Sequence, residues 1–308
     1  MPARARLLQE KSVHRLASGD FEAAFLPGAG MLGVSLQHRG TEILRRIEQL
    51  DSAFAKGGTA GIPLLHPWAN RLAAWRYHAA GRDVALDSAS PLLHRDANGL
   101  PIHGVPWSML VWNVSTATPT RLAAWLDWTR DDLLAVFPFR HRLEIAVDLA
   151  DDGLTLQTTL VAGPRDPVPV SFGFHPYLGL PGLPRHEWRL TLPAMRRLTL
   201  DALGIPTGAD ESFVALDVAL GEVDFDDGFA LLGEEASLSL SGGGRRISVD
   251  FLAGYRFAQI YAPRDQEFIA LEPMTAPTNA LVSGTGLRLV GPGASLSASF
   301  RIRVEALT

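Results

Sequence analysis

The side chains best suited to chemistry in this sequence are histidines and carboxylates that stand beside prolines and glycines. Glu272 follows the apolar run 268–271 and directly precedes Pro273, so we expect it at a strand end, where a side chain can reach a cleft. His175 directly precedes Pro176, and an imidazole with a pKa of about 6.5 can give or accept a proton near neutrality. Together they could perform general acid–base catalysis. From position alone, Glu272 could equally be a surface carboxylate and His175 a structural histidine in a turn.

Polar residues of this kind gather in five proline-rich or glycine-rich segments, where a core histidine or carboxylate would be poorly placed. Such segments are typical of loops that carry function on a rigid scaffold. The five segments are residues 61–72, 101–104, 169–180, 224–229 and 269–281.

Several common chemistries lack their usual sequence signals. The chain has no cysteine, which excludes a disulfide framework, a thiolate nucleophile and a cysteine-ligated metal. The nine histidines include neither a His-Glu-x-x-His helix nor a His-x-His pair, and no nucleophile elbow or phosphate-binding Gly-Lys-Ser/Thr loop occurs. We therefore expect a site without a metal or a cofactor.

The glycine pattern at residues 28–33 matches that of dinucleotide-binding loops, but it lacks the helix that such a loop requires at its third glycine. Residues 34–38 instead resume the alternation of a strand. We interpret this segment as a strand, a turn and a second strand.

The charge balance limits the possible partners. The chain has 28 lysines and arginines against 33 aspartates and glutamates, a net charge of −5. Because nucleic-acid binding requires an excess of basic side chains, we expect neither a nucleic acid nor an anionic membrane as a partner. No apolar run reaches the length of a signal peptide or a membrane span, so we expect a cytoplasmic protein.

Apolar and polar residues alternate along much of the chain, as in strands that bury one face. The alternation is clearest at residues 143–149, 154–160, 188–192 and 295–304. Residues 237–251 predict a hairpin, and the best helical pattern is short, at 130–136. No linker or shift in composition divides the chain. The sequence therefore favours one all-β domain over residues 1–308, a single large antiparallel β-sandwich.

The five segments resemble the aldose 1-epimerases, or galactose mutarotases, of bacteria. The resemblance spans most of the chain, and its motifs occur in the family's order and approximate spacing. They are Pro67-Trp68 with Asn70-Arg71, His103-Gly104, His175-Pro176-Tyr177, Glu272-Pro273-Met274-Thr275 with Asn279-Ala280, and Pro292-Gly293 before the last strand. The resemblance implies a β-supersandwich fold and a cofactor-free interconversion of the α and β anomers of a free aldose.

This reaction needs a base for the proton of the anomeric hydroxyl and an acid for the ring oxygen. The resemblance implies that Glu272 is the base and His175 the acid, and that His103 holds or polarises the sugar near its ring oxygen. After rotation about the C1–C2 bond, the same two groups with exchanged roles would close the ring on its other face.

The resemblance also implies residues that bind the sugar hydroxyls. Asn70 and Arg71 match two of them. We assign Asp227 as the hydroxyl-binding aspartate, with Asp224 and Asp226 as alternatives in the same acidic run.

Three aromatic residues lie beside these motifs and could stack on the apolar face of a sugar. They are Tyr177, Trp68 and Trp107. Tryptophans of an all-β protein more often belong to its core, and we place only Tyr177 among the substrate-binding residues.

Three departures from the family pattern leave the substrate open. Trp75 stands where the family usually has a glycine, Ala294 replaces a glutamate, and no arginine follows closely after Gly104.

Two alternatives to a free aldose therefore remain. The first is a hexose-6-phosphate 1-epimerase of the same fold, in which Arg71, Arg76 or Arg82 would pair with the phosphate. The second is a non-catalytic carbohydrate-binding protein. In each case we expect a small-molecule sugar as the partner and a monomer or homodimer as the assembly.

Overall fold

Strands dominate the computed structural model, which describes residues 13–45 and 60–307. Within these ranges the only α-helices are α3 (Asp131–Val136) and α4 (Ala280–Ser283). No helix in the same ranges is long and apolar enough to cross a membrane.

The larger of two main sheets has nine antiparallel strands and contains most of the predicted alternating segments. In β12, Leu143, Ile145 and Val147 are buried while the residues between them are at least partly exposed, so the predicted alternation is confirmed. The strands in sheet order are β10 (Asn113–Ala117), β11 (Arg121–Trp128), β12 (His141–Ala150), β13 (Gly153–Ala162), β27 (Ser295–Ala306), β23 (Arg245–Ala253), β22 (Ala236–Gly242), β17 (Arg189–Leu192) and β20 (Leu216–Ala219).

The second main sheet has eight strands and contains parts of four of the five polar segments. Its strands in order are β19 (Pro206–Phe213), β18 (Met195–Leu200), β21 (Phe225–Leu231), β24 (Phe257–Ala262), β25 (Ile269–Met274), β15 (Gly173–Phe174) and β5 (Leu64–Leu65), and β16 (Tyr177–Leu178) also pairs with β25. Aromatic contacts join the two sheets: the ring of Phe174 in β15 lies 5.1 Å from that of Phe300 in β27. The sheets therefore face each other across one apolar core.

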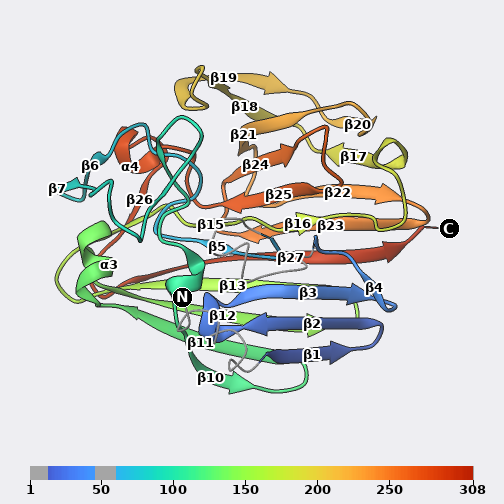
Figure 1. The fold of residues 1–308 in the computed structure, drawn as a ribbon, viewed down its shortest axis with the longest axis horizontal. Helices are drawn as coiled ribbons and strands as arrows, with labels where there is room; N and C mark the ends of the chain where they lie inside the picture. The colour runs from blue at the N-terminus through green and yellow to red at the C-terminus, as the bar shows by residue number, and fades with distance from the viewer. Residues whose placement is uncertain (1–12, 46–59, 308) are drawn as a thin grey trace.

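Smaller sheets complete the fold. A four-stranded sheet contains β1 (His14–Ser18), β2 (Phe21–Leu26), β3 (Leu32–His38) and β4 (Thr41–Glu42), and three two-stranded sheets pair β14 (Val168–Val170) with β26 (Arg288–Val290), β6 (Arg76–Ala79) with β7 (Arg82–Ala85), and β8 (His94–Arg95) with β9 (Pro101–Ile102). In Figure 1 the long strands run along the longest axis, and α3, α4, β6 and β7 gather at one end.

Three local predictions are confirmed. The helical pattern at 130–136 forms α3, whose first turn carries Asp131 and Asp132 at its positive end. The hairpin is β22–β23, and its turn residues Gly243 and Gly244 have positive φ angles of 55° and 74°, as a tight hairpin turn requires. After the glycine pattern at 28–33 the chain continues as strand β3.

Candidate active site

Glu272 lies inside a strand, with its carboxyl group among buried residues. All six residues of β25 are buried, and the Glu272 side chain is only 2% exposed. Burial raises the pKa of Glu272 well above its usual value, the negative charge of Asp226 raises it further, and the positive charge of Arg71 opposes the shift. The expected strand end is therefore wrong, and the carboxyl lies in mid-strand.

Strand pairing places His175 directly across from Glu272. Gly173 pairs with Met274 and Tyr177 pairs with Ala270, so the same register puts His175 opposite Glu272. The Nε2 atom of His175 lies 3.2 Å from Oε1 of Glu272, and the imidazole is 6% exposed. Burial lowers the pKa of His175 well below its usual value, with a further contribution from His103. Two residues far apart in the sequence thus form one buried pair.

The opposite directions of these two pKa shifts have a chemical consequence. Burial disfavours the carboxylate and the imidazolium alike, so a neutral carboxylic acid beside a neutral imidazole becomes competitive with the ion pair. Both forms contain the same number of protons and differ only in the position of one proton. The pair can therefore hold that proton on either residue, which an acid–base couple requires.

His103 completes a cluster of two histidines and one glutamate. Its ring lies 5.8 Å from that of His175 in an edge-on arrangement. Burial, with smaller contributions from Arg71 and His94, lowers the pKa of His103 to about 3, so its imidazole is neutral at pH 7.

The backbone around His103 is held in an uncommon conformation. His103 and Asn70 have positive φ angles of 61° and 56°, and the amide of His103 donates to the carbonyl of Asn70 over 2.9 Å. A Cβ atom at Gly104 would lie 2.4 Å from the carbonyl oxygen of His66, so only glycine fits there. Left-handed residues of this type concentrate at functional sites.

Arg71 is fixed by three neighbours. Its Nε donates to Asp96 over 2.8 Å, Nη1 donates to Asn70 over 3.3 Å, and Nη2 lies 3.6 Å from Oδ2 of Asp226. Asp96 was not among the predicted residues, although its place in the turn before Gly99 resembles the other polar loop positions. The guanidinium is thus oriented before any ligand binds.

The assignment of Asp227 as the hydroxyl-binding aspartate does not agree with the strand register. Asp227 pairs with Ile260 of β24, and its carboxylate binds Arg197 over 2.7 Å. Asp226 instead pairs with Tyr261 and accepts a hydrogen bond of 2.7 Å from Gln259.

The cross-strand partner of Gln259 is Glu272, so Asp226 shares the face of the Glu272–His175 pair and Asp227 lies on the opposite face. Asp226, one of the three aspartates considered, replaces Asp227 as the candidate. Gln259 was missed, although a buried amide in the apolar strand 257–262 is a signal that could have identified it.

Aromatic residues border His175. The Tyr177 ring stacks on the imidazole, with centroids 4.2 Å apart and planes 16° apart, and Tyr261 lies edge-on at 6.1 Å. Tyr261 was not predicted. Trp68, Trp107 and Tyr177 are 0%, 5% and 5% exposed, and of these three only Tyr177 stacks on His175.

Asn279 ties the last polar segment to the first. Its amide donates to the carbonyl of Arg71 over 2.9 Å, and its Oδ1 accepts from the amide of Ala73 over 2.8 Å. The five segments, separate in the sequence, are therefore linked around the Glu272–His175 pair.

Of the three arginines considered for a phosphate, only Arg71 lies beside the pair. Arg82 is bound to Asp166 over 2.7 Å, and Arg76 is exposed in the outlying β6–β7 hairpin.

Trp75, at the position where a glycine was expected, donates to the carbonyl of Gly99 over 3.1 Å and so packs on the neighbouring turn.

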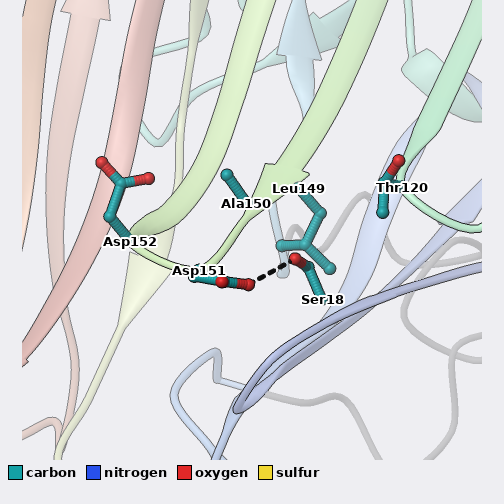
Figure 2. Close-up of a pocket in the computed structure, with 6 residues that line it drawn as sticks. All are labelled: Ser18, Thr120, Leu149, Ala150, Asp151 and Asp152. Carbon is teal, nitrogen blue, oxygen red and sulfur yellow. Dashed lines mark hydrogen bonds between the residues drawn. The ribbon is translucent and has the colours of Figure 1, made fainter.

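A separate hollow lies at the β12–β13 turn, beside Ser18 and Thr120. Figure 2 shows Asp151 at this hollow, where it accepts a hydrogen bond of 2.7 Å from Ser18. It contains none of the predicted site residues. In the described part of the chain no three histidine or acidic side chains are grouped to hold a metal ion.

Comparisons with known proteins agree with this architecture. A family model described as aldose 1-epimerase matches residues 15–303. Uncharacterized protein YihR of Escherichia coli K12 is 25% identical over 290 residues, covering 90% of this chain and 88% of its own.

Solved structures show the same fold at low sequence identity. A galactose mutarotase-like protein from Clostridium acetobutylicum has a TM-score of 0.82 and 20% identity, covering 97% of this chain and 96% of its own. The GalM/aldose epimerase homologue from C. elegans has a TM-score of 0.81 and 15% identity, covering 97% and 100%. These structures confirm the predicted all-β antiparallel fold of the galactose mutarotase type.

Proposed function

Since the chain belongs to the aldose 1-epimerase family, we propose that it interconverts the α and β anomers of a free aldose by general acid–base catalysis. The observation that carries this proposal is the buried contact of 3.2 Å between Nε2 of His175 and Oε1 of Glu272. An acid and a base this close can reach the two oxygen atoms bonded to one anomeric carbon.

The proton balance of ring opening fits this pair. Glu272, as carboxylate, takes the proton of the anomeric hydroxyl while the C1–O5 bond breaks and the C1 carbonyl forms. His175, as imidazolium, gives its proton to the ring oxygen. The reaction thus converts an ion pair into a neutral acid and a neutral imidazole, and ring closure on the other face reverses both transfers.

Burial favours the step that removes charge from the pair. Burial penalises the carboxylate and the imidazolium by desolvation. Ring opening is therefore favoured, because it converts both of these charged groups into neutral ones. The open-chain aldehyde needs no redox cofactor and no covalent bond to the protein.

The remaining polar side chains suit a substrate rich in hydroxyl groups. We assign hydroxyl recognition to Asn70, Arg71 and Asp226, and contact near the ring oxygen to His103. As a neutral imidazole, His103 offers one donor and one acceptor, which matches an uncharged sugar oxygen or hydroxyl.

A neutral aldose is favoured over a hexose phosphate. The guanidinium of Arg71 is already engaged by Asp96 and lies close to Asp226, whose negative charge would oppose a phosphate. Arg82 is bound to Asp166, away from the pair.

Polarimetry on freshly dissolved aldoses and on their 6-phosphates tests the proposal. We expect wild type to accelerate mutarotation of at least one unphosphorylated aldose. Acceleration confined to phosphates would establish the sugar-phosphate alternative, and no acceleration with any sugar would contradict the enzyme proposal. Sugar binding without acceleration by wild type would indicate a carbohydrate-binding protein.

A further inference from the structure

Arg185 is a buried arginine whose charge is surrounded by backbone carbonyls. It begins the short 3₁₀-helix η3 (Arg185–Glu187) and is 8% exposed. In the described ranges no carboxylate lies within ion-pair distance of its guanidinium. Burial lowers its pKa, whereas the charges of Asp224, Glu222 and Asp265 act to raise it. A guanidinium in such a place needs hydrogen-bond acceptors for all its donors.

The structure supplies one carbonyl for each of the five N–H groups. Nε donates to Gly221 over 2.9 Å, and Nη2 donates to Val223 over 2.8 Å and to Ala262 over 3.0 Å. Nη1 donates to Gln266 over 3.2 Å, with a longer contact of 3.5 Å to Phe268. The planar guanidinium therefore joins two connections that are far apart in the sequence.

Both connections lead into strands of the active site. Residues 221 and 223 precede β21, which carries Asp226. Residues 262–268 connect β24, which carries Tyr261, to β25, which carries Glu272. The ring of Phe268 lies 5.2 Å from that of Tyr177 and 5.9 Å from that of Tyr261. The carbonyls bound by Arg185 thus belong to backbone that leads into the strands carrying Asp226, Tyr261 and Glu272.

We propose that Arg185 is a positioning residue that, with the buried Phe268 packed behind Tyr261, fixes Asp226 and Tyr261 as sugar-binding residues of the site. This inference rests on the proposed mutarotase function. Glu272 depends less on these five hydrogen bonds of Arg185, which we call the clamp, because β25 is paired at both edges beside it, with Gln259 of β24 and, at Ala270, with β16. Asp226 pairs with β24 alone, since the pairs of β18 with β21 begin at Phe229. Loss of the clamp therefore affects sugar binding more than proton transfer.

Arg185→Lys tests whether Arg185 affects sugar binding more than proton transfer. A lysine has three donors on one nitrogen and cannot reach five carbonyls spread over a planar fork. At a temperature where the variant is folded, we expect KM for the aldose to rise at least about 10-fold, with kcat within about threefold of wild type. Leu190→Ala is the matched control, since it removes a fully buried side chain of β17 in the other main sheet. It should lower the unfolding temperature and leave KM unchanged.

Chemical rescue adds a second readout. With Arg185→Ala, millimolar guanidinium should lower the raised KM, and ammonium at the same concentration should not, because only guanidinium restores the fork of donors.

An unchanged KM in Arg185→Lys, or the same KM change in Leu190→Ala, would overturn the inference. So would Arg185 variants that do not fold while Leu190→Ala does, since the clamp would then serve the whole fold. Wild type without mutarotase activity would instead contradict the proposed function.

Discussion

At the scale of single residues, the site is costly to the folded state. Glu272 is buried, and its Oε2 has no hydrogen-bond partner among the described residues. A buried carboxyl of this kind is favoured only when it is neutral. The proposed mechanism, however, needs the carboxylate form for part of each cycle. The burial that raises the pKa of Glu272 therefore also lowers the stability of the folded protein whenever Glu272 is ionised.

Glu272→Gln should therefore stabilise the protein at alkaline pH. The folded wild type binds a proton at Glu272 more tightly than the unfolded chain does, so its free energy of unfolding falls as the pH rises above about 4.5. The amide does not titrate. Between that value and the raised pKa of the folded protein, we expect the free energy of unfolding of Glu272→Gln, relative to wild type, to increase by up to about 1.4 kcal/mol per pH unit, and to stay level at higher pH. Urea unfolding at several pH values measures it, and a difference that is constant with pH would contradict the raised pKa.

Asp226 and Asp227 offer a test in which the two variants differ by one position. Asp226→Asn removes a charged acceptor on the face of Glu272, and we expect KM to rise about 10-fold or more. Because Asp226 helps to raise the pKa of Glu272, the acidic limb of the rate profile should also move to lower pH.

Asp227→Asn is the matched control for that variant. Its carboxylate binds Arg197 on the other face, so KM and the pH profile should stay close to wild type. If Asp227→Asn has the larger effect on KM, the register argument is wrong. Steady-state kinetics from about pH 4 to about pH 9 cover the acidic and the alkaline limb of the rate profile.

At the scale of elements, β25 organises the site because three strands from two separate regions of the chain pair with it. β24 pairs along one edge, and β15 and β16 pair along the other. The loops that add His103, Asn70 and Arg71 are held to one another by backbone hydrogen bonds and by residues in the left-handed conformation.

Asn279 is the left-handed residue whose replacement is most informative. Its φ angle is 69°, and its side chain accepts from Ala73. Asn279→Ala loses this hydrogen bond and strains the backbone, so we expect a loss of about 1–3 kcal/mol in the free energy of unfolding. Asn279→Gly tolerates the conformation and should lose less, while Asn279→Asp keeps the acceptor and should lose least. Chemical denaturation gives the order, and equal losses for alanine and glycine would contradict a role of the backbone conformation.

The strand register distinguishes Asp226 from Asp227 as the candidate on the face of Glu272. Within 224–229, the alternation of a strand puts Phe225, Asp227 and Phe229 on one side and Asp226 on the other. The two phenylalanines are buried, so the pattern contained the signal that Asp226 faces away from them. A shift of one residue reverses every such assignment, and only the ladder to β24 fixes it.

At the scale of the whole molecule, a buried histidine pair connects the first polar segment to the nine-stranded sheet. Nδ1–H of His141 donates to the carbonyl of Phe139 over 2.6 Å, so its Nε2 is the acceptor for His66, 3.0 Å away. Burial lowers the pKa of His141 to about 4 and that of His66 well below its usual value, so both rings are neutral at pH 7.

These histidines should make the fold sensitive to acid. The unfolded chain takes up protons at both residues below about pH 6.5, whereas the folded protein does not, so stability falls as the pH decreases from there towards 4. His141→Gln removes one of these groups. We expect the slope of its unfolding free energy against pH to be smaller than that of wild type by up to about 1.4 kcal/mol per pH unit. Denaturant titrations between those pH values measure it, and equal slopes would show that His141 is protonated in the folded state.

Local pattern and long-range pairing differed in how well the sequence predicted them. The ten-residue strand β12 alternates clearly, and its presence follows from the hydrophobic pattern alone. β15 and β16 are two residues each, too short for any periodicity, and exist because β25 pairs with them. The contact of His175 with Glu272 depends on that pairing, so only the resemblance to a family suggested it beforehand. Arg185 stood in no motif, and its five acceptors are backbone atoms, which a sequence does not reveal.

The most direct test of the account is a double-mutant comparison of anomer exchange. Exchange spectroscopy by NMR on an equilibrated aldose, with wild type, Glu272→Gln, His175→Asn and the double variant, measures the interconversion rate itself. Because the two residues transfer protons in one concerted cycle, each single variant should lose about 10²- to 10⁴-fold in rate, and the double variant should lose no more than the worse single. Either single variant retaining the wild-type rate, or losses that multiply in the double variant, would contradict a joint acid–base pair.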